Sequence, residues 1–210
     1  MIFRATGKPK VDIRVRRLCR ARPECERPIL LLDVDGVINI LWDDDGLETR
    51  STNVDGPRAT TYPITYLPSI VKRINAINKN LADVVWHTTW GSFAKTNLAP
   101  ALGFEDFAVS SMDHKCDRQV KVEFAKAVNR GRTLVWLDDD VHNLLNKTES
   151  EWFLSRPGPT QCLNPYPLTP VDLDFIEKFL ADPHAYAETR KLRDSPSFFR
   201  RQRKVKQWWL

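Results

Sequence analysis

The sequence predicts an α/β protein in which helices cover both faces of a mostly parallel β-sheet. Short runs of consecutive apolar residues, such as ILLLDV at 29–34 and LVWLD at 134–138, are typical of strands buried on both faces. Segments with apolar residues at helical spacing separate these runs. Strands that alternate with helices favour parallel pairing through right-handed crossovers. We therefore expect a three-layer, Rossmann-like core.

The first half of this core begins with the strand at 29–34, which ends at the turn signal Asp35-Gly36. The stretch 42–66 is rich in turn-forming residues and predicts a loop or a small β-excursion, too short for a large cap domain. A helix at 67–77 and a buried strand at 82–88 follow. Together these elements form a β-α-β unit.

The second half continues the alternation of strands and helices. We expect a short strand, a helix, a further strand and a weaker strand, at 107–110, about 117–129, 134–138 and near Cys162 respectively. The sequence TPVD at 169–172 has a capping pattern with proline at the first helical position, and it opens a last helix.

Charge divides the chain into a body and two ends. Residues 1–27 hold nine Lys and Arg against three acids, and residues 184–210 hold eight against two, so an acidic body lies between two basic ends. We predict a basic N-terminal arm at 1–27, one α/β domain at 28–182 and a basic, aromatic C-terminal tail at 183–210. Such arms either bind a polyanion such as DNA or RNA or are simply solvated.

The composition, 42% hydrophobic and 28% charged, is ordinary for a globular protein. No apolar run approaches the roughly 20 residues of a membrane-spanning helix, and the N-terminal stretch lacks the apolar centre of a secretory signal. We expect a cytoplasmic protein without a membrane partner. The four cysteines are scattered, which favours free thiols over a disulfide or a zinc site.

The residues that finish the apolar runs are the candidates for chemistry, because ligands of such sheets bind beyond the carboxyl ends of the strands. Asp33 and Asp35 finish the first run, Thr88 the second, and the acids 138–140 another. Two acids at i and i+2 project to the same side of an extended chain. Clustered carboxylates repel unless a hard divalent cation lies among them, and oxygen-only ligands select Mg²⁺. The sequence therefore predicts a Mg²⁺ site.

Four segments, taken in order, resemble the motifs of the haloacid dehalogenase-like (HAD) phosphohydrolases. They are LLLDVDGVI, the strand ending WHTTW, a lysine that opens a helix, and LVWLDDD. The closing PLTPVDLDFIEKFL is similar to the last helix of the small bacterial and phage branch with a minimal cap. The resemblance covers roughly residues 28–181, and it implies a HAD-like catalytic domain there.

The resemblance implies a role for each residue that matches a motif. Asp33 would be the nucleophile that forms an aspartyl-phosphate. Asp35 would be the general acid and base, with its backbone carbonyl facing Mg²⁺. Thr88 would donate a hydrogen bond to a phosphoryl oxygen, with Thr89 as the neighbouring alternative.

Two lysines compete for the third motif, Lys115 before the helix and Lys121 in its early turns. We favour Lys121, because in the branch that this sequence resembles the lysine stands about one short helix ahead of the acidic strand end. Asp139 would be the Mg²⁺ ligand of the last motif, with Asp138 beside it. Trp90 could line the entrance and stack on a base or sugar of the substrate.

These inferences predict a Mg²⁺-dependent phosphatase that hydrolyses a phosphomonoester through an aspartyl-phosphate. A site without a large lid suggests a bulky substrate, and the basic arms suggest a nucleic-acid end or another phosphorylated macromolecule. A non-catalytic module that binds nucleic acid or protein is the alternative. Phosphoryl transfer to an acceptor other than water shares the first half-reaction and stays open.

Overall fold

The computed structural model describes residues 27–41, 47–111, 118–128, 131–155, 158–189 and 192–194. Lys115, the predicted N-terminal arm up to residue 26 and residues 195–210 of the predicted tail lie outside these ranges. Within them, no helix has the length and apolar character needed to cross a membrane.

The main sheet has six strands, and every neighbouring pair is parallel, which confirms the predicted α/β class. In spatial order its strands are β5 (Ala108–Val109), β4 (Asp83–Trp86), β1 (Ile29–Leu32), β6 (Leu134–Leu137), β7 (Thr160–Asn164) and β8 (Leu192–Asp194). The strands β1, β4 and β6 are short and almost wholly buried, as expected for central strands that are covered on both faces.

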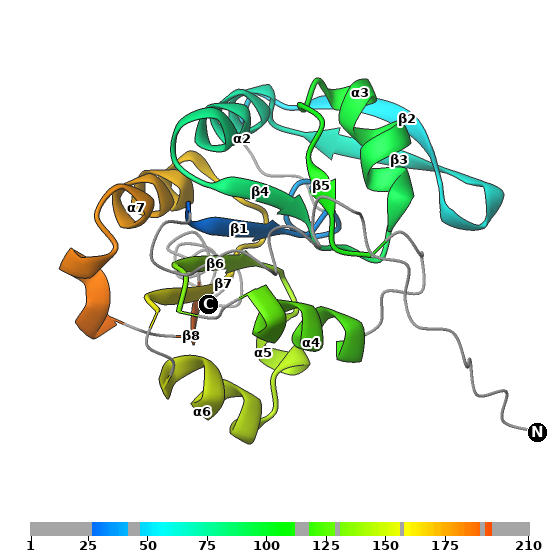
Figure 1. Ribbon diagram of the computed structural model, residues 1–210. Helices are drawn as coiled ribbons and strands as arrows, with labels where there is room; N and C mark the ends of the chain where they lie inside the picture. Colours follow the sequence, from blue (N-terminus) through cyan, green and yellow to red (C-terminus); the bar gives the residue numbers. More distant parts are fainter. Residues whose placement is uncertain are drawn as a thin grey trace, which may run out of the picture.

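Helices cover both faces of this sheet and give the three layers (Figure 1). On one face lie α2 (Pro68–Asn80) and α7 (Pro170–Ala181), and on the other lie α4 (Arg118–Val128), α5 (Val141–Leu144) and α6 (Lys147–Ser155). Leu30 and Leu32 of β1 belong to the core under α2 and α7. Ile29 and Leu31 belong to the core under α4 and α6. This alternation is the period-2 pattern of a strand that is buried on both sides.

The stretch predicted to be a loop or a small β-excursion forms an antiparallel hairpin, β2 (Arg50–Gly56) and β3 (Thr60–Tyr66). It is a separate two-stranded sheet, and it extends to the side toward which the arrowheads of β1 and β4 point in Figure 1. Val54 and Ile64 anchor it, because both side chains are buried in the main core.

Several elements lie where the sequence analysis placed none. The segments η3 (Ala94–Leu98) and α3 (Ala99–Leu102) follow β4, α5 and α6 follow β6, and η4 (His184–Thr189) follows α7. Most of these are single turns too short to show a helical period. Strand β8 pairs with β7 beyond the predicted domain boundary at 182, so the sheet extends into the segment predicted to be a tail.

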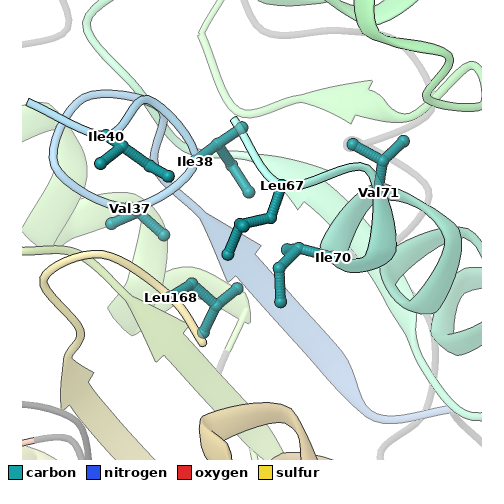
Figure 2. A pocket seen from close by; sticks show the side chains of 7 residues that line it. All are labelled: Val37, Ile38, Ile40, Leu67, Ile70, Val71 and Leu168. Atoms are coloured by element: carbon teal, nitrogen blue, oxygen red, sulfur yellow. The ribbon is translucent and has the colours of Figure 1, made fainter. Parts of the chain in front are cut away.

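An apolar pocket fixes the loop that follows β1 (Figure 2). The loop contributes Val37, Ile38 and Ile40, and Figure 2 shows them facing side chains from the start of α2 and from the loop before α7; these are Leu67, Ile70, Val71 and Leu168. The space among these side chains is too small for a water molecule, so these contacts are packing. The Leu168 amide also donates to the Val37 carbonyl at 3.0 Å, so packing and hydrogen bonding both position this loop.

Candidate functional site

The strand order creates a switch point beside β1. From β1 the chain moves to β4 and β5 on one side, then returns to β6 and β7 on the other side. In open parallel sheets the crossover helices on the two sides of such a point lie on opposite faces, and this leaves a crevice at the carboxyl ends of the strands. The candidate site lies at this crevice, on residues that follow β1, β4 and β6.

Three carboxylates meet at the ends of β1 and β6. These strands pair with Leu32 opposite Leu137, and the Asp33 amide donates to the Leu137 carbonyl at 3.0 Å. The ladder therefore brings Asp33 beside Asp138. Asp33, Asp138 and Asp139 offer ligand atoms that all lie within 4.8 Å of one another, a group that could hold a metal ion.

A buried lysine bridges two of these acids. The Lys121 Nζ lies 2.7 Å from Asp33 Oδ2 and 2.7 Å from Asp138 Oδ2. Burial alone lowers the pKa of Lys121, but the charges of Asp33 and Asp138 outweigh burial and raise this pKa above its ordinary value. Lys121 is therefore a permanent cation that holds one oxygen of each carboxylate. The preferred third-motif lysine lies in the predicted site.

The acids themselves carry an excess of negative charge. Burial, followed by the charge of Asp33, raises the pKa of Asp138 to about 7 and that of Asp139 to about 6. Both Asp138 oxygens have partners, since Oδ2 binds Lys121 and Oδ1 accepts from the Asp140 amide at 3.0 Å. Asp139 is only half-buried. Asp139 is therefore the member of the pair that is better placed to accept a ligand.

The Asp35 carboxylate lies outside this three-acid cluster, although the i, i+2 pattern predicted that it would stand beside Asp33. Strand β1 ends at Leu32, and the chain turns so that the Val34 carbonyl accepts the amides of residues 37, 38 and 39. Alternation holds only for extended backbone, so the turn redirects Asp35. Burial, with a smaller contribution from Asp33, raises the pKa of the Asp35 carboxyl.

The Asp35 carboxylate is held by two side chains. Trp90 Nε1 donates to Oδ2 at 3.0 Å, and Asn39 Nδ2 donates to Oδ1 at 3.3 Å. Asn39 also accepts the Thr65 amide at 3.1 Å, which ties this loop to β3 of the hairpin. Asn39 was not among the candidates from sequence, although a buried amide within the apolar run VINIL is a signal that could have identified it.

Thr88 and Thr89 follow β4 at the same edge of the sheet but differ in exposure. Thr88 is buried, and its hydroxyl oxygen accepts the Trp90 amide at 3.3 Å. Within the described ranges, the Thr88 hydroxyl has no acceptor for its own proton, so it can donate to a ligand. Thr89 is exposed and lines a cavity together with Asp35 and Trp90. The Trp90 ring is itself buried and packs against Tyr62.

His87 is a further residue of the site that was not among the candidates from sequence. Its Nε2 lies 3.1 Å from the Lys121 carbonyl and its Nδ1 lies 2.8 Å from Ser110 Oγ. Because a carbonyl only accepts, Nε2 carries the proton, and Nδ1 accepts from the Ser110 hydroxyl in the neutral ring. Complete burial, and then the charge of Lys121, hold the pKa of His87 well below its ordinary value.

This buried imidazole predicts a loss of stability in mild acid. Below pH 6.5 the unfolded chain protonates His87 while the folded protein does not, so the free energy of unfolding falls as pH falls, by up to about 1.4 kcal/mol per unit. Urea unfolding between pH 7.5 and 5 should show a shallower dependence in His87→Gln than in the wild type. Equal slopes for the two proteins would contradict this role of His87.

Comparison of the chain with protein-family models, curated proteins and solved structures gives no match. The fold and the site define a parallel α/β protein with an acidic cluster, bridged by a lysine, at the switch point of its sheet. The functional argument therefore rests on this geometry and on its chemistry.

Proposed function

We propose that this protein is a Mg²⁺-dependent phosphatase of the HAD type with a minimal cap, and that it hydrolyses a phosphomonoester through an aspartyl-phosphate. The observation that carries the proposal is the contact of Lys121 with Asp33 and Asp138, within a cluster of three carboxylates at the sheet's switch point. An ion pair that only stabilised the fold would not need a third, half-buried carboxylate beside it, one that forms no ion pair with any described residue.

The residues of the cluster fit a hard divalent cation. Their donors are carboxylate oxygens, and Mg²⁺ prefers oxygen ligands. Asp33, Asp139 and, to a lesser degree, Asp138 would hold it. When bound, Mg²⁺ would offset the negative charge of the acids and of a phosphate and polarise the phosphoryl oxygens.

Gly36 offers a test of this cation site. A Cβ at Gly36 would lie 2.0 Å from Asp139 Oδ2, and the residue has a φ of +71°. Gly36→Ala should therefore displace Asp139 and weaken Mg²⁺ binding about tenfold or more in isothermal titration calorimetry. Gly103→Ala is the matched control, because its φ is +86° but nothing lies within 4 Å of its Cβ. Both variants should lose about 1 kcal/mol of stability, and only the first should lose Mg²⁺ affinity.

In the first half-reaction, an Asp33 oxygen would form a bond to phosphorus while the bond from phosphorus to the leaving oxygen breaks. Lys121 Nζ contacts Asp33 Oδ2 at 2.7 Å and fixes the orientation of this carboxylate. The raised pKa of Asp35 suits a general acid that gives its proton to the leaving oxygen. Thr88 has a hydroxyl proton to donate to a phosphoryl oxygen as negative charge develops there.

In the second half-reaction, Asp35 would take a proton from a water molecule as that water attacks phosphorus. The bond between Asp33 and phosphorus breaks, which releases inorganic phosphate and restores the Asp33 carboxylate. Both proton transfers need a carboxyl group that changes its protonation state within one cycle. The hydrogen bonds from Trp90 and Asn39 keep Asp35 in one place through both steps.

Within the described ranges, the hairpin β2–β3 is a small excursion beyond the sheet near the site, and no large cap domain stands beside it. This supports an open site that accepts a large substrate, such as a phosphorylated nucleic-acid end. The basic arms that would add affinity for such a substrate lie almost wholly outside the described residues, and nucleic-acid binding stays a prediction.

The test of the proposed function is the release of phosphate from 4-nitrophenyl phosphate by the full chain. We expect turnover with millimolar Mg²⁺ and none in excess EDTA. Binding of DNA or RNA that weakens with salt, without any turnover of this substrate, would instead support the non-catalytic module.

A further inference from the structure

A cavity lies between the hairpin and the loop after β4, and Asp35 is one of the residues that line it. Its volume is about 190 Å³, below the roughly 300–1,000 Å³ of sites that enclose a whole small molecule. It is therefore large enough for one part of a ligand. The residues that line it are Asp35, Pro57, Arg58, Tyr62, Thr89 and Trp90.

The walls of this cavity are built from flat and polar groups. The rings of Tyr62 and Trp90 lie 5.2 Å apart at 54°, and the Tyr62 hydroxyl donates to the Pro57 carbonyl at 3.3 Å. A Cβ at Gly56 would lie within 3 Å of both rings, so glycine is needed there to let them approach. The cavity thus has an aromatic wall beside the half-buried carboxylate of Asp35.

Arg58 lies at the tip of the hairpin in an unfavourable backbone conformation. Its φ is +63° and that of Ala59 is +52°, a region that L side chains other than Asn and Asp rarely adopt. Glycine or asparagine would fit this tight turn better. Strained residues of this kind cluster at functional sites. Arg58 also lines the cavity, and no carboxylate in the described part of the chain forms an ion pair with it.

We propose that this cavity binds the leaving group of the phosphomonoester and that Arg58 selects leaving groups that carry a negative charge of their own. This inference rests on the proposed function, because it places the leaving oxygen beside Asp35, the general acid. A neutral leaving group would fill the cavity equally well by size. Only an anionic one would gain a hydrogen-bonded ion pair with the guanidinium.

The anion must approach a cavity that already contains a carboxylate. Asp35 is turned toward Trp90 and Asn39, which donate to its two oxygens. Arg58 is exposed at the rim, whereas Asp35 lies at the inner end. The site therefore suits a group with its charge at the outer end, such as a carboxylate or a phosphodiester.

The test compares two aryl phosphates of nearly the same shape, 4-carboxyphenyl phosphate and its neutral isostere 4-carbamoylphenyl phosphate. For the wild type we expect kcat/KM to be about tenfold higher for the carboxylate. Arg58→Gln should remove this preference, because its loss of kcat/KM should be about tenfold larger for the carboxylate than for the amide. A second pair, a 3′-phosphorylated dinucleotide and the corresponding nucleoside 3′-phosphate, shows whether a phosphodiester is the preferred anion.

Two further variants separate charge from backbone strain. Ala59→Gly relieves the strain next to Arg58 without removing the cation, and should raise the midpoint of thermal unfolding while keeping the tenfold preference. Arg58→Gly should raise this midpoint and abolish the preference. Equal turnover of both members of each pair by the wild type would overturn the inference and leave the phosphatase proposal standing. If the wild type hydrolyses none of the four compounds, both the inference and the phosphatase proposal are overturned.

Discussion

Asp33→Asn should abolish Mg²⁺-dependent phosphate release, with a loss of at least about 10³-fold in kcat. An amide has neither the charge nor the nucleophilic oxygen that attack on phosphorus requires. The substitution keeps the size of the side chain, and Lys121 keeps its contact with Asp138 at 2.7 Å. The variant should therefore fold. The measurement compares the initial rates of variant and wild type with 4-nitrophenyl phosphate. Circular dichroism spectra of both proteins check that the variant is folded.

Asp140→Asn is the matched control for this substitution. Asp140 belongs to the same run of acids, but it is exposed and is not a member of the three-acid cluster. Its backbone amide, which donates to Asp138, is retained in the variant. We expect its rate to stay within about threefold of the wild type. Wild-type turnover by Asp33→Asn would contradict the proposed nucleophile.

Lys121→Met should destabilise the protein by about 3–5 kcal/mol in the absence of divalent cations. The lysine is the cation that compensates two buried carboxylates, and its removal leaves Asp33 and Asp138 beside each other without a cation between them. Urea unfolding in EDTA measures this loss. Phosphatase activity should fall as well, because Asp33 loses the contact that orients it.

Added Mg²⁺ should restore part of the stability lost in Lys121→Met, since a cation among the acids would replace some of the missing positive charge. The control is Lys126→Met on the same helix, where the lysine pairs with the exposed Glu123 at 3.2 Å. An exposed pair of this kind contributes at most about 1 kcal/mol. Similar losses for the two variants would show that Lys121 does not compensate the acids.

The central part of the fold could be predicted from the sequence because the patterns that indicate it lie within single segments. Each apolar run became a strand, and the residue that follows each run lies at the carboxyl edge of the sheet, as for Asp33 and Asp138. The capping pattern before α7 is present, since the Asp172 carboxylate accepts both the amide and the hydroxyl of Thr169. Parallel pairing of neighbouring strands brings these strand-end residues together at one edge of the sheet, where they form the candidate site.

Other parts depend on contacts between distant segments, which leave little trace in sequence. The turn after β1 redirects Asp35 toward Trp90, 55 residues away. In the sequence, His87 is visible only as one polar residue at a strand end. Its role depends on the hydrogen bond between its Nε2 and the Lys121 carbonyl. Short helices such as α3 and α5, with four residues each, carry too few apolar positions to define a period.

The hairpin and the main sheet hold different parts of the proposed site. The residues on the two elements are positioned by different contacts. Asp33 and Asp138 are fixed by neighbouring rungs of one ladder, so the spacing between them changes only if the sheet itself comes apart. Arg58 lies in the three-residue segment that connects β2 and β3, which takes no part in the pairing of β1 with β6. On the proposed function, substitutions at this tip would change which leaving groups are accepted without moving the acid cluster.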